Sequence, residues 1–227
     1  MAAPSSAVPR GTEVKARPNA VRRQPDAVPR TAILAPHGGG IETGTSELCL
    51  AIAGYHPADL APTDGPLHDY WMFEGLLSTG NTRLHVTSTN CDDTVARAIA
   101  GGSLNAIGLH GCKPEQADLP AGTQAVLVGG RNTAFKSLLL TRLNAAGVQA
   151  IDASSVPNLN GDEPANIANR TRLAAGAQLE LTTPLRQAMF GTNARADRKH
   201  TTLALFWTFT TATRAAVTDL GVIQPTA

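Results

Sequence analysis

The segment of the chain with the clearest chemical potential is APHGGGIETGTSE, residues 35–47. A short apolar run ends at His37, three glycines follow, and Glu42 stands five positions after the histidine. Glycine lacks a Cβ and tolerates positive φ, so such a run lets the backbone turn sharply. Because open α/β sheets place their functional groups at the carboxyl edge of the strands, the turn is expected to bring His37 and Glu42 together there. An imidazole and a carboxylate are two ligands of the kind that a catalytic zinc ion uses.

A second strand pattern supplies a third ligand. LNAIGLHG, residues 104–111, is an apolar run that ends in His110 and Gly111, as the first run ends in His37 and Gly38. A catalytic zinc ion commonly takes three protein ligands and leaves one position for water, which fits two histidines and Glu42. The alternative is that each histidine is a structural residue with its own hydrogen bond. The repeated pattern beside a carboxylate favours the metal set.

Glu180 is the candidate for proton transfer. A metal-activated water needs a base, and GAQLELT, residues 176–182, offers Glu180 within an alternation of polar and apolar side chains. The same alternation is typical of the solvent face of an edge strand, and the pattern alone favours that alternative.

Two arginines and a histidine are candidates for substrate contacts. Arg170 lies in NIANRTR and Arg186 in TTPLR, and a guanidinium can bind a carboxylate through two parallel hydrogen bonds. His85 is expected to project from a strand opposite Leu84 and Val86, where a role near the substrate and a structural hydrogen bond both remain open.

Short apolar runs alternate with stretches of helical period, which predicts an α/β body whose helices pack on a mixed, largely parallel central sheet. Strands are expected at 31–35, 70–74, 83–88, 104–110, 124–129, 148–151 and 177–181. Helices are expected at 45–53, 92–100, 132–146 and 201–220, with a short one at 164–169.

Length and composition predict one domain with an extension. The chain has 227 residues, 42% hydrophobic and 16% charged, which suits a single buried core at residues 31–227. Residues 1–30 contain five prolines and six basic residues against two acidic ones, and they are expected to form a basic, extended arm. Such an arm can bind another subunit or an acidic polymer, or simply stay solvated. Nucleic acid is not the expected partner.

The cysteines and the amino terminus indicate a protein made in the cytoplasm. Cys49, Cys91 and Cys112 are odd in number and show no CxxC spacing, so reduced thiols are expected. The first 30 residues lack the apolar stretch of a secretory signal, and no later run is long enough to predict a membrane span.

With these residues in view, the chain resembles the phage-type poly-γ-glutamate hydrolases, zinc enzymes whose fold is related to the carboxypeptidase-like α/β class. The matching stretches are APHGGGIETGTSEL at 35–48, FEG at 73–75, LHVTS at 84–88, IGLHG at 107–111, VLVGG at 126–130, NIANR at 166–170 and QLELTTPLR at 178–186.

The resemblance implies zinc on His37, Glu42 and His110, with Glu180 as general base. It also implies hydrolysis of γ-glutamyl amide bonds in a polyanionic polymer, with Arg170 and Arg186 binding its carboxylates. An enzyme made without a signal would then reach an extracellular polymer after cell lysis. The sequence departs from the pattern at the basic arm, and Cys112 directly after His110 and Gly111 is a residue that can perturb the metal site.

Two alternatives remain open. The first keeps the metal chemistry but acts on small N-acyl amino acids or γ-linked peptides. The second is a virion-associated or assembly protein that retains the fold and uses residues 1–30 for contacts.

Overall fold

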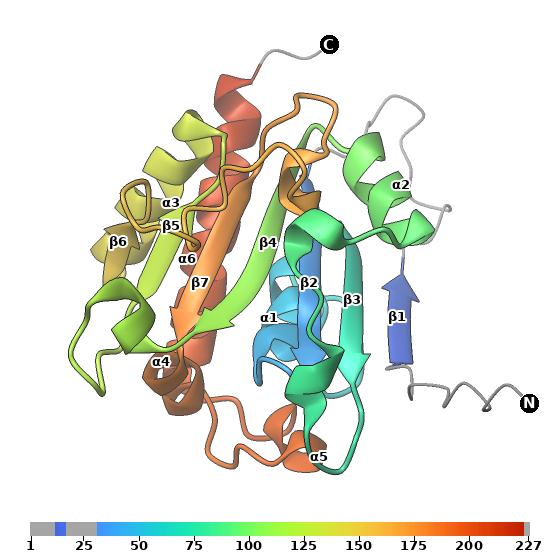
Figure 1. Ribbon diagram of the computed structural model, residues 1–227, viewed down its shortest axis with the longest axis vertical. Coiled ribbons are helices and arrows are strands. Elements are labelled where there is room, and N and C mark those ends of the chain that lie inside the picture. The colour runs from blue at the N-terminus through green and yellow to red at the C-terminus, as the bar shows by residue number, and fades with distance from the viewer. Residues whose placement is uncertain (1–11, 17–30, 225–227) are drawn as a thin grey trace, which may run out of the picture.

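A seven-stranded sheet forms the centre of the computed structural model, which describes residues 12–16 and 31–224 (Figure 1). Its strands lie in the order β1-β3-β2-β4-β7-β5-β6, and all neighbours are parallel except β1 with β3 and β5 with β7. The strands are β1 Thr12–Ala16, β2 Thr31–Gly39, β3 Asp69–Gly75, β4 Asn105–Cys112, β5 Val126–Gly129, β6 Ala150–Asp152 and β7 Ala177–Thr182. The predicted mixed, largely parallel sheet is confirmed.

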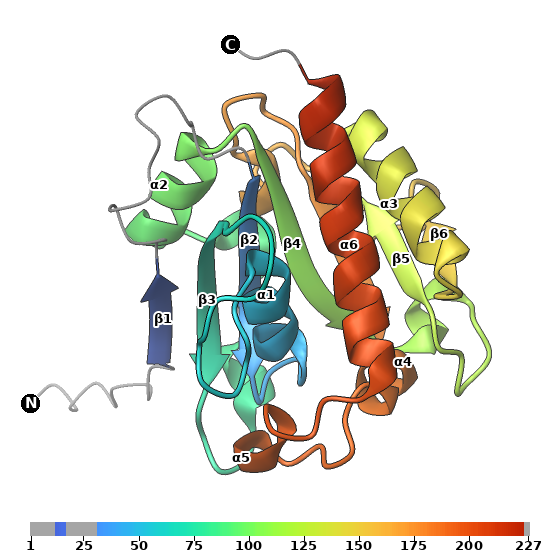
Figure 2. The same cartoon turned by 180° about the vertical axis from the view of Figure 1, so that it is seen from behind.

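Helices cover both faces of this sheet. The α-helices are α1 Thr45–Ala53, α2 Thr94–Gly102, α3 Thr133–Ala145, α4 Thr183–Ala188, α5 Arg195–Arg198 and α6 Ala204–Ile223. Figure 2 shows α1, α3 and α6 on one face, where they share the larger apolar core with the sheet. The smaller core on the opposite face contains α2. Ile33 of β2 belongs to the larger core and Leu34 to the smaller, as the two-residue period of a doubly covered strand requires. In the described part of the chain, no helix combines the length and apolar character needed to cross a membrane.

The carboxyl ends of β2, β4 and β7 point to the same end of the sheet, with α4 and α5 beyond them (Figure 1). Most predicted elements are present with bounds shifted by a few residues. The geometry expected of His37 and His110, two histidines at one edge of one sheet, is therefore available.

One predicted strand, 83–88, is wrong. Its residues instead enter two 3-10 helices, η2 Asn81–Leu84 and η3 Ser88–Asn90, joined by three residues of irregular backbone. The apparent alternation was misleading because Leu84 is buried while Val86 is 52% exposed, so the two side chains do not share a face. The backbone N–H of His85 donates to the carbonyl of Thr82, which closes the turn.

Part of the segment expected to be an arm belongs to the sheet. β1 pairs antiparallel with β3, from Thr12 opposite Glu74 to Ala16 opposite Tyr70. The rest of that segment, residues 1–11 and 17–30, lies outside the described residues.

Candidate metal centre

The glycine-rich turn after β2 places His37 and Glu42 side by side. The backbone N–H of Glu42 donates to the carbonyl of His37 at 2.8 Å, which folds the turn back on itself. Gly39 has φ +66°, and a Cβ there would lie 2.6 Å from the carbonyl oxygen of Gly75 on β3. Only glycine permits both this backbone conformation and this approach. Ser46 fixes the turn from α1, because its Oγ accepts the Gly39 N–H at 2.8 Å.

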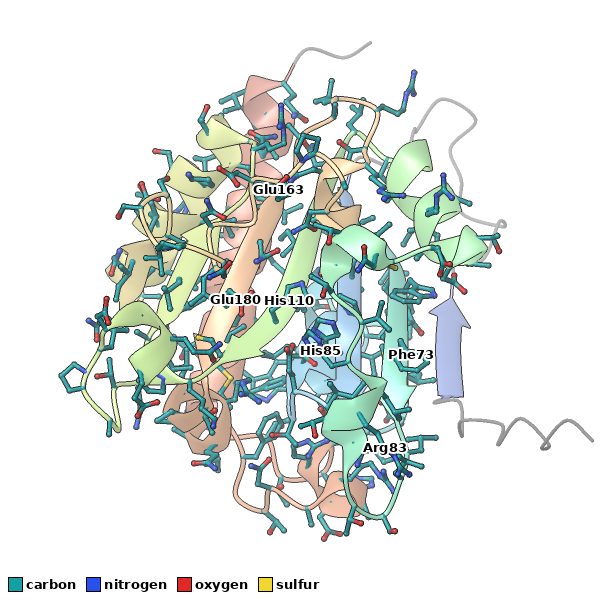
Figure 3. All side chains as sticks on the ribbon, viewed as in Figure 1. Phe73, Arg83, His85, His110, Glu163 and Glu180 are labelled. Carbon is teal, nitrogen blue, oxygen red and sulfur yellow. The ribbon has the colours of Figure 1, made fainter. Side chains whose placement is uncertain are left out.

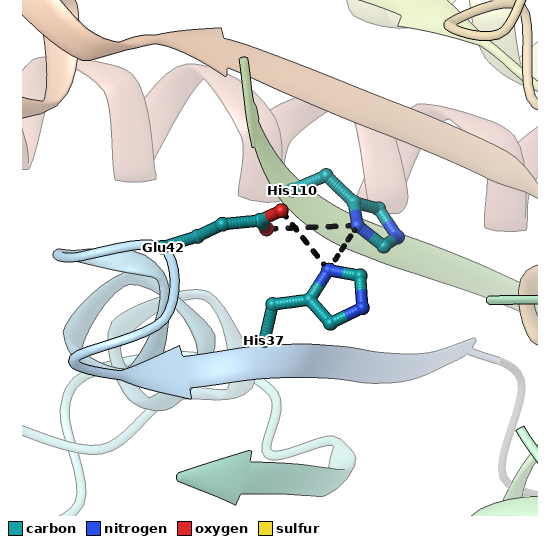
Figure 4. Close-up of side chains that lie close together, drawn as sticks. All are labelled: His37, Glu42 and His110. Carbon is teal, nitrogen blue, oxygen red and sulfur yellow. Dashed lines mark hydrogen bonds and ion pairs between the residues drawn. The ribbon is translucent and has the colours of Figure 1, made fainter. Parts of the chain in front are cut away.

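Three side chains from distant parts of the sequence converge at this point (Figure 4). His37 Nδ1 lies 3.1 Å from Glu42 Oε1 and 3.0 Å from His110 Nδ1, and all the candidate ligand atoms lie within 4.8 Å of one another. Glu42 Oε2 accepts the backbone N–H of Gly111 at 2.8 Å, so β4 holds the carboxylate as well as supplying the histidine. The structure thus brings together the three residues expected to bind metal.

The outward nitrogens of both imidazoles have partners. His37 Nε2 lies 2.8 Å from the carbonyl oxygen of Val86, and His110 Nε2 lies 3.0 Å from Ser88 Oγ. A carbonyl only accepts, so His37 carries a proton on Nε2 and a neutral ring presents a lone pair at Nδ1. In the His110 tautomer whose Nε2 donates to Ser88 Oγ, both Nδ1 atoms present lone pairs to one point, 3.0 Å apart, and they could share a cation there. The donor set therefore fits a zinc ion.

Charge and burial favour the ionisation states that metal binding requires. Burial alone would raise the pKa of Glu42, but hydrogen bonds that His110, His37 and His85 can donate to it in the absence of metal outweigh burial and hold that pKa well below its usual range. Burial lowers the pKa of His110, which keeps its ring neutral. A carboxylate and a neutral imidazole are the forms that ligate metal.

His85 lies beside the three ligands although it does not come from a strand. Its ring stacks on His37 with centroids 3.8 Å apart, and its Nε2 lies 3.5 Å from Glu42 Oε1. The hydrogen bond with Glu42 raises the pKa of His85. The side chain is 43% exposed, so it borders the site on the solvent side.

Glu180 is buried next to His110, contrary to the edge-strand alternative. β7 lies between β4 and β5, and the parallel register sets Glu180 opposite His110, so both side chains leave the same face of the sheet (Figure 3). Glu180 is only 6% exposed. Burial, and after it the charge of Glu42, raises the pKa of Glu180 well above its usual range.

The two candidate arginines differ in burial and in their hydrogen-bond partners. Arg186 is buried and donates to the carbonyls of Leu181 and Thr43 at 3.1 and 2.8 Å. Its guanidinium packs against Gly111 beside the Glu42 carboxylate. Arg170 is partly exposed and donates to the carbonyls of Ala165 and Thr89.

Cys112 does not enter the ligand set. Its thiol lies 3.8 Å from the carbonyl oxygen of Glu180 and packs in a small apolar cluster with Leu127 and Leu159. Burial raises the pKa of this thiol to about 12, so it stays neutral. All three cysteines are free, as the sequence predicts.

Gly111→Ala tests the packing of Arg186 against β4. A Cβ at Gly111 would lie 2.5 Å from the guanidinium carbon of Arg186, so the arginine must move. We expect a loss of about 1–3 kcal/mol in the free energy of unfolding, measured by denaturant unfolding. Gly102→Ala is the matched control, because a Cβ there meets nothing within 4 Å. Equal stability in both variants would contradict the close contact.

The fold and the site define an α/β protein with a two-histidine, one-carboxylate centre at the carboxyl edge of its sheet. Residues 13–212 match the family described as poly-gamma-glutamate hydrolase, and the chain belongs to this family. The resemblance seen in the sequence is thereby confirmed.

The chain is also similar to individual proteins of known sequence or structure. The chain is 33% identical to protein YndL of Bacillus subtilis (strain 168) over 178 residues and 33% identical to the SPbeta prophage-derived protein YoqZ of the same organism over 180 residues. These matches cover 78% and 79% of this chain but only 63% and 59% of the relatives. A solved bacteriophage poly-gamma-glutamate hydrolase superposes with a TM-score of 0.78 at 28% identity, covering 95% of this chain and 91% of that one. The zinc-free apo form of YndL gives a TM-score of 0.74 at 28% identity, covering 92% and 90%.

Proposed function

We propose that this chain is a zinc-dependent hydrolase that cleaves γ-glutamyl amide bonds of poly-γ-glutamate. The observation that carries the proposal is the convergence of His37 Nδ1, His110 Nδ1 and the Glu42 carboxylate, with the outward histidine nitrogens already bound. Membership of the poly-gamma-glutamate hydrolase family supports the substrate, and a relative described in a zinc-free form supports the ion.

Zinc held by His37, Glu42 and His110 would supply the Lewis acidity that polarises water and the scissile carbonyl. Glu180 is the general base: it takes a proton from the attacking water and gives a proton to the amine nitrogen as the amide C–N bond breaks. Its burial suits this role, because burial raises the pKa of Glu180 and so makes its carboxylate a stronger base than an exposed one.

Cationic side chains near the metal centre would bind the carboxylates of an acidic substrate. Arg186 donates from Nε to Leu181, from Nη1 to the carbonyl and Oγ1 of Thr43, and from Nη2 to Thr183, which leaves one N–H on Nη2 for a glutamyl carboxylate. We assign Arg170 and His85 to further carboxylates of the polymer. His85 is partly exposed beside Glu42, and Arg170, also partly exposed, donates to the carbonyl of Thr89, the residue after the Ser88 that contacts His110.

Metal analysis followed by incubation with poly-γ-glutamate tests the proposal. We expect about one zinc ion per chain, hydrolysis that stops in chelator and returns with zinc, and no hydrolysis of α-linked polyglutamate. His110→Ala should lose both zinc and activity. His56→Ala, which removes a partly exposed histidine whose ring lies 5.4 Å from that of Trp207, should keep both.

The products separate the proposal from its nearest alternative. Oligomers released from the polymer support an endo-acting polymer hydrolase, whereas activity confined to small N-acyl amino acids or short γ-linked peptides supports the alternative. Hydrolysis that persists in a protein stripped of zinc would exclude both.

A further inference from the structure

A chain of three side chains connects the backbone of η5 (Ile167–Asn169) to the Glu180 carboxyl group. The Ala168 N–H donates to Asn166 Oδ1 at 3.0 Å, Asn166 Nδ2 donates to Gln178 Oε1 at 2.6 Å, and Gln178 Nε2 donates to Glu180 Oε1 at 2.9 Å. Asn166, Gln178 and Glu180 are each at most 6% exposed, so solvent competes little for these bonds.

The direction of this amide chain is set at its backbone end. A main-chain N–H can only donate, so Asn166 must turn its oxygen toward Ala168 and its NH2 group toward Gln178. Gln178 then presents its own oxygen to Asn166 and its NH2 group to Glu180. Every amide orientation follows from one fixed donor.

Packing holds Gln178 in this orientation. Gly161 has φ +61°, and a Cβ there would lie 2.8 Å from the Gln178 side chain, so the loop backbone presses closely on the amide. Asn169 holds the loop, because its Nδ2 donates to the Gly161 carbonyl at 2.8 Å. Rotating Gln178 would break bonds at both ends of its amide.

We propose, resting on the function proposed above, that Asn166 and Gln178 are positioning residues that commit Glu180 Oε1 to accepting an N–H and leave Oε2 as the oxygen that takes and returns the catalytic proton. The amide chain acts through Glu180 and does not touch the substrate. It holds Glu180 in one rotamer and keeps the exchanging proton on Oε2, not on Oε1, throughout the reaction.

Asn166→Asp and Asn166→Ala together test the direction of the chain. The aspartate variant keeps an acceptor for the Ala168 N–H, but its second oxygen requires a donor, so the Gln178 amide must turn and face Glu180 Oε1 with its oxygen. The alanine variant removes the acceptor without reversing Gln178. A structural role predicts that the nearly isosteric aspartate is the milder change, because aspartate remains a good acceptor for a backbone N–H.

We expect the opposite order. Asn166→Asp should lower kcat about 10-fold to 100-fold at unchanged KM and zinc content, and Asn166→Ala should lower it less. Turnover in Asn166→Asp equal to or above that of Asn166→Ala overturns the proposal.

Gln178→Met is the second variant, since it keeps side-chain length and removes the donor to Oε1. We expect a fall in kcat of about 10-fold, again with KM and zinc content unchanged, and wild-type turnover would overturn the proposal. Should the Asn166 variants not fold, this measurement decides alone.

Glu180→Gln, assayed in parallel, distinguishes a failure of the positioning role from a failure of the general-base assignment. An inactive Glu180→Gln together with the wrong order at Asn166 refutes only the positioning role. Unchanged turnover in Glu180→Gln refutes the assignment of the base itself.

Discussion

Glu180→Gln is expected to lower the turnover of poly-γ-glutamate about 100-fold to 10,000-fold while zinc remains bound. The amide keeps an oxygen that can accept from Gln178, so the packing around β7 is preserved, but it cannot take a proton from water. The measurement is kcat together with the zinc content of the purified variant. Glu163→Gln is the matched control, because Glu163 is exposed (Figure 3).

The pH profile provides a second check on the same residue. Burial, followed by the charge of Glu42, raises the pKa of Glu180, so the side chain is protonated at acidic pH and becomes a base as pH rises through that raised value. Activity of the wild type should therefore rise with pH above the usual range for carboxylates, and this limb should be absent from residual activity of Glu180→Gln. A variant with turnover near the wild-type rate would contradict the assignment.

The three candidate ligands could be predicted because each depends on local sequence. His37 and His110 both end apolar runs, Glu42 follows a glycine turn, and the carboxyl ends of parallel strands share an edge. That His37 and His110 actually meet depends in addition on β2 and β4 being neighbours in the sheet, which the structure shows.

Glu180 shows where local sequence fails. The alternation around it is the same for an edge strand and for a central strand with a buried polar group, and strand order decides between them. β7 pairs with β4 and β5, which buries the carboxyl group. Here only the resemblance to known hydrolases singled out the residue, whereas the pattern by itself favoured an exposed edge strand, which is not its environment.

The partners of the ligands could not be predicted for a different reason. Val86 contributes a carbonyl oxygen, which carries no side-chain signal, and Ser88 approaches His110 only because 83–88 is not a strand. β1 was also missed, because its pairing with β3 joins residues far apart in the chain across a proline-rich segment.

A buried arginine that the sequence analysis did not single out, Arg198, holds together the elements next to the metal centre. Arg198 of α5 is 1% exposed and donates to Glu47 Oε1 at 3.0 Å and to the carbonyl oxygen of Gly39 at 3.1 Å. It also donates to the carbonyl of Asn193. One side chain thus connects α1, α5 and the end of β2, two residues after His37.

Arg198→Met is expected to lower the free energy of unfolding by about 3–5 kcal/mol, because it leaves the buried Glu47 carboxylate without its cation. Denaturant unfolding measures the loss. Arg97→Met, which removes an exposed arginine from α2, is the control and should stay within about 0.5 kcal/mol of the wild type.

The destabilisation of Arg198→Met should depend on pH in a defined direction. Burial raises the pKa of Glu47 even with Arg198 in place, so the folded state binds this proton more tightly than the unfolded chain does. A raised pKa gives a contribution that is fully present below the pKa of the unfolded chain and is lost as pH rises through the folded value. Without Arg198 the folded value rises further, so the variant should lie closer to the wild type near pH 4 than near pH 8. Adding Glu47→Gln removes the buried charge and should restore part of the stability at pH 8. A loss of equal size at both pH values, unchanged by Glu47→Gln, would mean that Arg198 contributes through packing and its carbonyl contacts and not through its charge.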